Sequence, residues 1–295
     1  MDQRIKKHSL GFWEVAAKPT QQELQKYYAE KYFQEAKGSY ELEYTKEELS
    51  WFNAKLEQRS VILQRHLPHL REKKGQLLDV GCGEGYALAF FRKQGWTVKG
   101  IDFSSAGVKS KNPACMDNLA TGDIFALVQA EISAGAVYDV VWLQNVLEHV
   151  IDPLALLKSL RKLVSPGGLA VVTVPNDCSI TQRAALAHQH IDSAFWVLPP
   201  DHLAYFDSVS LTNATNATGW ECVDMFGDFP VDWFLFHPGS NYVRDNSAAG
   251  KAAHSARVQI ENLIHEQPIE DVLRFWSAAA KLGIGRCITT FLRPN

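Results

Sequence analysis

The stretch that decides the fold is residues 77–85, which read LLDVGCGEG. A short apolar run ends in glycines at alternate positions, and Gly81 and Gly83 let the backbone turn sharply and approach a ligand without interference from a Cβ atom. We expect a β-strand followed by a helix whose first N–H groups point at that ligand. In a doubly wound sheet this is the carboxyl edge of the first strand, where ligands bind.

Outward from this turn, β-rich runs alternate with helical stretches over residues 76–175. Strands are expected at 76–82, 97–102, 137–143 and 169–175, and a weaker one in the stretch MDNLATGD (116–123). Helices should run from 85 to 94, from Ser104, and from Asp152-Pro153 to a stop at Ser165-Pro-Gly-Gly168. Near-continuous apolar strands separated by helices indicate a parallel sheet covered on both faces.

The flanking regions have a different organisation. Residues 1–74 are predicted to be a helical cap or lid, with a capping box at Thr20 and Glu23 and a second helix over 46–67. Beyond residue 175 we expect a helix over 207–219, strands over 220–226 and 286–292, and helices around 247–265 and 268–282. Insertions at about 177–206 and 228–284 interrupt the main domain, which spans 75–295.

Composition excludes several classes of protein. The 295 residues are 46% hydrophobic and carry a net charge of −3, so the chain can bury a core and has no electrostatic reason to bind nucleic acid or an acidic membrane. Five cysteines without a C-x-x-C pair argue against a disulfide framework or a zinc site. The N-terminus has no apolar signal segment and no run reaches 18 apolar residues, so we expect a cytoplasmic protein.

Acidic residues follow the strands at the ligand-binding edge. Asp102 ends the second strand and can accept both hydroxyls of a ribose. Asp123 and Ile124 follow the third strand, where a carboxylate can accept from an adenine amino group. Asp79 stands two residues before the first glycine and would repel a pyrophosphate, which, with the G-x-G-x-G spacing, disfavours a dinucleotide. A ligand with an ammonium and a sulfonium would be attracted.

These motifs, with YDVVWLQNVLEHV at 138–150 and HLAYF at 202–206, resemble class I S-adenosylmethionine (SAM)-dependent methyltransferases, particularly the ubiquinone-biosynthesis, sugar and natural-product O-methyltransferases. The resemblance implies a Rossmann-like seven-stranded doubly wound sheet whose last strand is antiparallel. It also implies the SAM-binding residues, which we expect to be Asp79, Gly81, Cys82, Gly83, Gly85, Asp102, Phe103, Asp123, Ile124, Gln144, Tyr28 and Tyr32.

Two histidines are candidates for the proton acceptor in methyl transfer. His149 follows the fourth strand and His202 lies in the segment before the sixth, and imidazole is suited to taking a proton from a hydroxyl near neutral pH. In small-RNA 2′-O-methyltransferases a similar Glu-His pair holds a divalent metal with a second Glu and a second His. Here Asn145 resembles that second Glu position, so no metal is expected, although a metal site on Glu148 and His149 stays an alternative.

The predicted function is SAM-dependent O-methylation of a small molecule, either a carbohydrate or nucleotide sugar, or a phenolic or quinone-type metabolite. An inactive SAM-binding protein and an NAD-dependent oxidoreductase are the alternatives. Aromatic residues of the insertions suit a planar acceptor ring, a hydrophobic mini-core or a homodimer interface equally well. They are Phe195, Trp196, Phe229, Trp233, Phe234 and Phe236.

Overall fold

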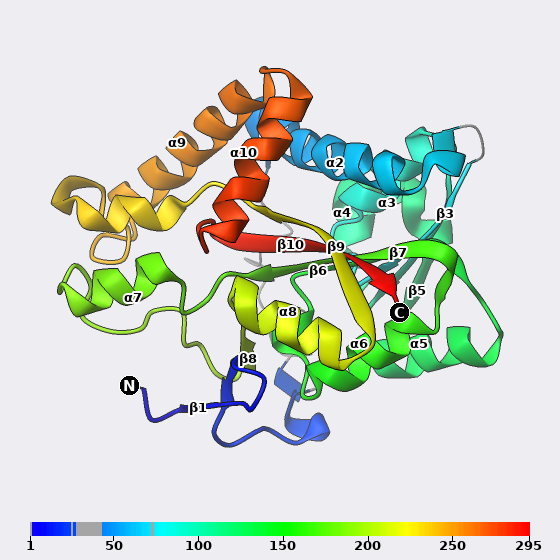
Figure 1. Cartoon of the computed structure of the whole chain (residues 1–295), viewed down its shortest axis with the longest axis horizontal. Helices are drawn as coiled ribbons and strands as arrows, with labels where there is room; N and C mark the ends of the chain where they lie inside the picture. The colour runs from blue at the N-terminus through cyan, green and yellow to red at the C-terminus, as the bar shows by residue number, and fades with distance from the viewer. Residues whose placement is uncertain (1, 25, 28–42, 72–73) are drawn as a thin grey trace.

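The computed structural model describes residues 2–24, 26–27, 43–71 and 74–295. Its centre is a seven-stranded sheet with the strand order β5-β4-β3-β6-β7-β10-β9 (Figure 1). The strands are β3 (Gln76–Val80), β4 (Thr97–Asp102), β5 (Leu119–Thr121), β6 (Tyr138–Gln144), β7 (Val164–Pro175), β9 (Trp220–Gly227) and β10 (Cys287–Pro294).

The strand directions confirm the predicted doubly wound sheet. β3 pairs in parallel with β4 and β6, and β6 pairs in parallel with β7. β10, the last strand in the sequence, lies between β7 and β9 and is antiparallel to both, as predicted. The carboxyl ends of β3, β4, β5 and β6 therefore meet at one edge.

Helices cover both faces of this sheet. One face carries α5 (Ile124–Ser133), α6 (Pro153–Arg161) and α8 (Ser208–Ala217), and the other carries α2 (Lys46–His66), α3 (Tyr86–Lys93), α4 (Ala106–Lys111), α9 (Ala248–His265) and α10 (Ile269–Lys281) (Figure 1). The remaining helical elements are α7 (Ile180–Ala187) and the 3-10 turns η2 (Pro68–Arg71), η3 (Pro113–Asn118), η4 (Leu147–His149), η5 (Val231–Phe236) and η6 (Pro238–Ser240).

Side-chain caps place the helix starts close to where the sequence predicts them. Thr45 and Glu48 form a capping box at the start of α2, and Asp152 caps α6 by accepting from the Ala155 N–H. Asp207 caps α8 in the same way. Each cap satisfies backbone N–H groups that have no partner inside the helix.

One expectation about the core is confirmed in part and another differs from the structure. The third strand, Leu119–Thr121, lies within the predicted stretch MDNLATGD, whose first residues belong to the 3-10 turn η3. The helix α6 ends at Arg161, so Ser165-Pro-Gly-Gly168 does not stop it but lies within β7, where the pairing register with β6 shifts. A bulge accommodates the proline and the glycines inside a strand.

The first 15 residues form strands that the sequence analysis did not predict. β1 (Ile5–Lys7) pairs with β2 (Trp13–Val15), and β2 pairs with β8 (Ala204–Tyr205), in a separate three-stranded sheet. The predicted capping box at Thr20 and Glu23 is present and opens a helical stretch. No helix in the described part of the chain is long and apolar enough to cross a membrane.

Candidate active site

Two adjoining cavities lie at the carboxyl edge of the parallel strands. The first has a volume of about 580 Å³ and the second about 220 Å³, and Gly81, Gly83 and Gln144 line both. The first cavity is also lined by Asp102, Phe103, Asp123, Ile124, Asn145 and His149, and the second by Lys55, Arg59, Asp79, Cys82, Glu84 and Tyr86. The two cavities therefore meet around the glycine-rich turn.

The glycine-rich turn is shaped by backbone angles that favour glycine. Gly81 has a φ of +75°, and a Cβ atom there would lie 2.2 Å from a methyl group of Val146. Gly83 has a φ of +56° with no protein atom within 4 Å of its Cβ position, so it leaves space for a ligand. Gly85 lines neither cavity; it precedes α3 and faces Val108.

Asp102 anchors this turn from the neighbouring strand. The Gly83 N–H donates to Asp102 Oδ2 (2.8 Å), and the Ser104 N–H donates to Oδ1 (2.9 Å). Burial raises the pKa of this carboxyl, and hydrogen bonds from the Ser104, Gly83 and Phe103 backbones lower it in part. Because a carboxylate has about four acceptor positions, Asp102 keeps acceptor capacity for a ligand in the first cavity.

Asp123 lies at the far end of the first cavity and has a structural role as well. It is the N-cap of α5, and its Oδ1 accepts from the Ala126 N–H (2.9 Å). Gln21 donates to Oδ2 at 3.4 Å, which brings the N-terminal segment to the cavity. Ile124 and Leu24 add apolar lining there.

The second cavity combines a buried carboxyl with two basic side chains. Burial, together with the nearby charge of Asp102, raises the pKa of Asp79 to about 8. Opposite it, α2 presents Lys55 and Arg59. Lys55 Nζ lies 3.2 Å from Asp228 Oδ2 and 3.7 Å from Glu261 Oε2. Burial lowers the pKa of Arg59, so this guanidinium favours an anion beside it.

Arg59 keeps one hydrogen-bond donor unused. Its guanidinium donates to the Lys55 carbonyl (3.2 Å) and to Thr289 Oγ1 (3.0 Å), whereas its buried Nε has no protein partner. A buried unsatisfied donor is costly, and an anionic group in the second cavity would satisfy it. Burial of Cys82 on the same wall raises the pKa of its thiol.

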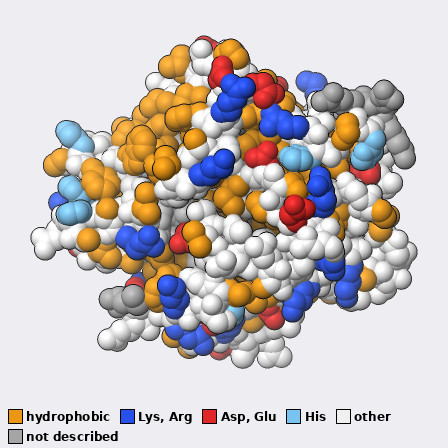
Figure 2. Space-filling model, viewed as in Figure 1, with side chains coloured by type: hydrophobic (Ala, Val, Ile, Leu, Met, Phe, Trp, Pro, Cys, Tyr) orange, Lys and Arg blue, Asp and Glu red, His pale blue; other side chains and the backbone are white. Residues whose placement is uncertain are grey.

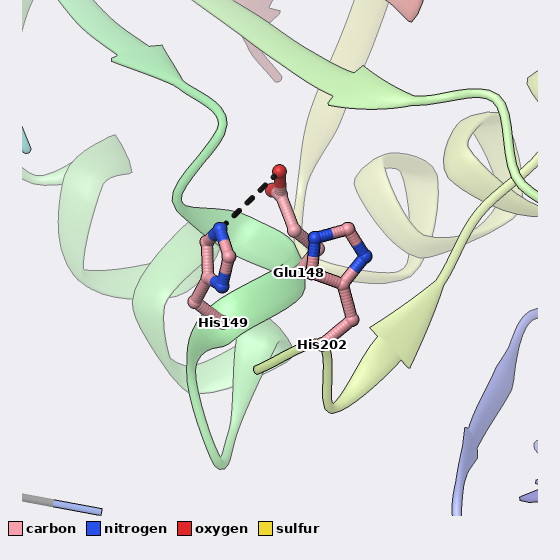
Figure 3. A group of neighbouring side chains, drawn as sticks. All are labelled: Glu148, His149 and His202. Atoms are coloured by element: carbon pink, nitrogen blue, oxygen red, sulfur yellow. Dashed lines mark ion pairs between the residues drawn. The ribbon is translucent and has the colours of Figure 1, made fainter. Parts of the chain in front are cut away.

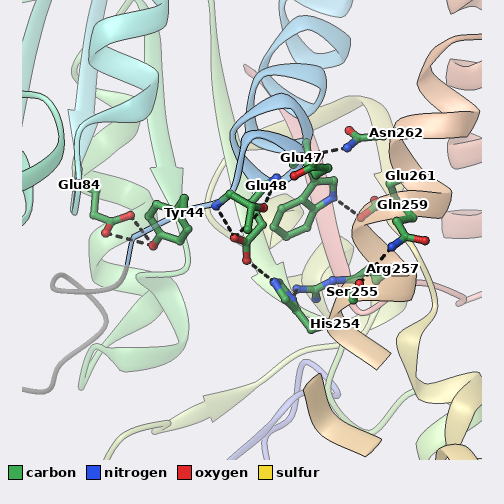
Figure 4. Close-up of polar contacts among 12 residues, drawn as sticks. Tyr44, Glu47, Glu48, Glu84, His254, Ser255, Arg257, Gln259, Glu261 and Asn262 are labelled. Carbon is green, nitrogen blue, oxygen red and sulfur yellow. Dashed lines mark hydrogen bonds and ion pairs between the residues drawn. The ribbon is translucent and has the colours of Figure 1, made fainter. Parts of the chain in front are cut away.

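Helix α2 is held over the second cavity at its N-terminal end (Figure 4). The Tyr44 hydroxyl donates to Glu84 Oε2 (2.9 Å) in the glycine-rich turn. Glu48 Oε1 lies 2.7 Å from His254 Nε2, and the Trp51 indole N–H donates to Glu261. These contacts join α2 to the turn on one side and to α9 on the other, and so fix the position of Lys55 and Arg59.

A third group of polar side chains lies next to the first cavity (Figure 3). His149 Nε2 is 3.7 Å from Glu148 Oε1, and the rings of His149 and His202 are 4.9 Å apart. Glu148 is fully buried, which raises its pKa to about 8. Although 53 residues separate them in sequence, the fold brings the two predicted proton acceptors together.

Asp177 and Arg286 support this group from behind. Arg286 donates to Asp177 Oδ1 (2.9 Å), and Asp177 Oδ2 lies 3.5 Å from His202 Nδ1. Burial alone would raise the pKa of Asp177, but the charge of Arg286 and contacts with His202 lower it. Asp177 is therefore an anion that fixes the orientation of the His202 ring.

The aromatic residues of the insertions do not line the two cavities in the part of the chain that the structure describes. Tyr28 and Tyr32 lie outside the described residues. Trp196 and Phe229 are core residues, whereas Trp233 and Phe236 are exposed. Figure 2 shows hydrophobic side chains gathered on the surface over α9 and α10. The aromatic residues proposed for acceptor binding line neither cavity; they are Phe195, Trp196, Phe229, Trp233, Phe234 and Phe236.

The sequence analysis missed Lys55, Arg59, Asp177 and Arg286. The sequence does contain a pattern that indicates a buried Arg59. Leu56 lies three residues before it and Leu63 four residues after it, which places Arg59 on the apolar face of α2. A charged residue on such a face needs a partner inside the protein. Asp177 and Arg286 are 109 residues apart, and no local pattern links them.

Comparison with protein families gives a match that covers more than half of the chain. The model of a family described as "Methyltransferase domain" matches residues 54–225. This range contains the glycine-rich turn, Asp102, Asp123 and the Glu148–His149 pair. Lys55 and Arg59 also lie inside it, whereas the N-terminal strands and the helices α9 and α10 lie outside.

Curated relatives match a shorter part. A ubiquinone biosynthesis O-methyltransferase of Vibrio cholerae is 38% identical over 98 residues, which are 32% of this chain and 39% of that protein. One from Caulobacter sp. is 34% identical over 132 residues, or 43% of this chain and 51% of that protein. The chain thus spans about two fifths to one half of the curated relatives it matches.

A solved structure matches over nearly the whole length. The plantazolicin methyltransferase BpumL, in complex with a monoazolic desmethylPZN analog and SAH, has a TM-score of 0.51 and 16% sequence identity. The match covers 93% of this chain and 97% of that one. At this identity the likeness establishes the shared fold alone.

Proposed function

Since the chain belongs to the methyltransferase-domain family and is a class I SAM-dependent methyltransferase, we propose that it methylates an oxygen atom of a small-molecule acceptor. SAM supplies a methyl group on a sulfonium; the acceptor oxygen forms a bond to that methyl while the C–S bond breaks and its electron pair stays on sulfur. The acceptor's O–H proton has to leave in the same process.

The two cavities fit the two ends of SAM. Asp102 would accept from the ribose hydroxyls, with Phe103, Asp123 and Ile124 around the adenine in the first cavity. In the second cavity, Asp79 would face the ammonium of the methionine part and Arg59 its carboxylate. A zwitterion in this cavity would place a positive charge beside Asp79, whose pKa is raised by burial, and would give the buried Arg59 Nε an acceptor.

This placement puts the reacting methyl near the residues that line both cavities, Gly81, Gly83 and Gln144. His149 lines the first cavity five residues after Gln144. We therefore propose that the acceptor hydroxyl loses its proton at the group formed by Glu148, His149 and His202. This group, next to the cofactor cleft, is the observation that carries the assignment to O-methylation.

The proposed acceptor is a phenol or an alcohol on a small molecule. The relatives named for ubiquinone biosynthesis favour a phenolic ring, and the net charge of −3 gives no support to a nucleic acid. We propose that residues 1–74 cover the cofactor, since Gln21 and Leu24 line its cavity. The insertions at about 177–206 and 228–284 would bind the acceptor, and the first of them carries Asp177 and His202.

The test is formation of S-adenosylhomocysteine by the full chain with SAM and matched acceptors. Catechols, simple phenols, sugars and amines of similar size should be compared, with the methylated product identified by mass spectrometry and NMR. Products carrying a methyl group on oxygen would support the proposal. Methylation confined to nitrogen, sulfur or carbon acceptors would refute it.

A further inference from the structure

We propose that an exposed apolar face on α9 and α10 binds the same face of a second copy of this chain, so that two helix pairs pack together about a two-fold axis. The large side chains of this face are each 37–63% exposed; they are Ile260 and Leu263 on α9, Phe275 on α10 and Leu282 at the end of α10. In Figure 2 the hydrophobic side chains over these two helices lie on one side of the molecule.

Helix α10 is apolar on two sides. One side carries Val272, Leu273 and Trp276, which are buried, and packs against β9. The other side carries Phe275 and, seven residues later, Leu282, which are 50% and 63% exposed. A helix that lies on the surface of a globular protein typically has polar residues opposite its buried face. The second apolar side of α10 therefore indicates a second packing partner.

Helix α9 extends the same face with a stripe of its own. Ala252, Ala256, Ile260 and Leu263 follow one another at intervals of four, four and three residues, which places them on one side of the helix. Because α9 packs against α10, the two stripes form one surface (Figure 1). The small alanine side chains let another helix approach closely.

The area of this face suits a dimer. An aromatic side chain has a surface of roughly 150–250 Å², so four large side chains that are about half exposed present on the order of 400 Å². A dimer interface of ordinary size buries about 800 Å² per partner, of which about 65% is apolar in homodimers. The large side chains, with Ala252 and Ala278 exposed between them, supply most of that apolar part.

The charges beside the face favour a second copy over a membrane. Helix α10 begins with Glu270 and Asp271, and its basic residues Arg274 and Lys281 lie further along. When a two-fold axis packs α10 antiparallel to its copy, the acidic end of each helix lies beside the basic end of the other, and such complementarity fixes the register. An anionic membrane would instead attract a face with an excess of Lys and Arg.

The face is separate from the proposed chemistry. None of its residues lines either cavity at the carboxyl edge of the sheet. A dimer formed in this way would leave both cavities accessible, so that association and cofactor binding are measured independently.

The first experiment is analytical ultracentrifugation of the full chain from about 1 to about 100 μM, since interfaces of this size have dissociation constants from micromolar downward. We expect the parent to reach twice the 33.0 kDa mass of the chain. Phe275→Glu and Leu263→Glu should each weaken the dimer at least about 100-fold, because the two-fold axis places each substitution in the interface twice. Val209→Glu is the matched control, because Val209 is 68% exposed on α8 across the sheet. All three variants should bind SAM as the parent does.

The second experiment tests the antiparallel arrangement by disulfide trapping. Ala278 is exposed between Phe275 and Leu282, so the two-fold axis should pass close to it. A disulfide requires Cα atoms within about 7 Å of each other. Mild oxidation should therefore give a covalent dimer of Ala278→Cys, whereas the parent and Val209→Cys should stay uncrosslinked.

Three results would overturn the dimer face. One is a parent that binds SAM and stays monomeric at every concentration. Another is a dimer that both Phe275→Glu and Leu263→Glu retain. The third is a monomer that binds anionic phospholipid vesicles and loses this binding in the same two variants, which would assign the face to a membrane. A monomeric protein would leave O-methylation standing, and a failure of O-methylation would leave the dimer standing.

Discussion

Replacing Asp102 with alanine tests the orientation of the cofactor. In the structure the carboxylate accepts the Gly83 N–H at Oδ2 and the Ser104 N–H at Oδ1, and the side chain lines the first cavity. Two ribose hydroxyls would donate to its remaining lone pairs. A hydrogen bond to a charged group contributes about 1.5–3 kcal/mol, so losing two costs about 3–6 kcal/mol, or on the order of 10²–10⁴ in the dissociation constant of SAM.

The same substitution also frees the Gly83 and Ser104 N–H groups, so the turn itself could change. Asp102→Asn separates the two effects. The amide keeps one oxygen for the Ser104 N–H and for one hydroxyl, but its NH₂ group cannot accept from Gly83. We therefore expect its SAM affinity to fall between those of the parent and of Asp102→Ala.

Calorimetric titration with SAM, together with thermal unfolding of each variant, measures both effects. Asp117→Ala is the control. Asp117 is exposed in η3 and lines neither cavity, and its substitution removes the same charge as Asp102→Ala. It should bind SAM as the parent does. A folded Asp102→Ala protein whose affinity matches that of Asp117→Ala would refute the assignment of the first cavity to the nucleoside.

Four other substitutions give distinct outcomes. Gly81→Ala should lower the melting temperature because its Cβ would overlap Val146, whereas Gly83→Ala should stay closer to the parent in stability, apart from backbone strain of about 1–2 kcal/mol, and lose SAM binding. Arg59→Met should weaken SAM binding about 10- to 100-fold by calorimetry, the loss of one charge-assisted hydrogen bond. In the SAM-free protein, the raised pKa of Asp79 makes stability fall as the pH rises from about 4 to about 8, and melting curves of Asp79→Asn should lack this component. An unchanged pH dependence in Asp79→Asn would contradict the buried, protonated carboxyl.

The features that the sequence predicts well are set by local chemistry. Asp152 and Pro153 define the start of α6, because a capping side chain and a fixed φ act within one helical turn. The glycine-rich turn and Asp102 are predicted for the same reason, since each follows directly from the end of a strand. The strand β10 was predicted from its own residues, whereas its antiparallel direction was predicted from the family resemblance.

The features that the sequence does not reveal depend on contacts between distant segments. The strands β1 and β2 are three residues each, too short for a clear alternation, and they form because β8 provides a partner about 190 residues later. The group around His149 needs β8 to bring His202 within 4.9 Å. No periodicity in either segment specifies that approach.

Strand β10 connects the two halves of the site. Thr289 on this strand accepts from Arg59 (3.0 Å) and shares a hydrogen bond with Thr173 on β7 (2.9 Å), so it positions the guanidinium of the second cavity. Arg286, the residue before β10, holds Asp177, which in turn faces His202. Because β10 is inserted between β7 and β9, one end of a single strand contacts both the proposed methionine site and the proposed acceptor site. A change in the register of β10 would therefore displace Arg59 and Asp177 together, which makes the antiparallel strand part of the active site as well as of the fold.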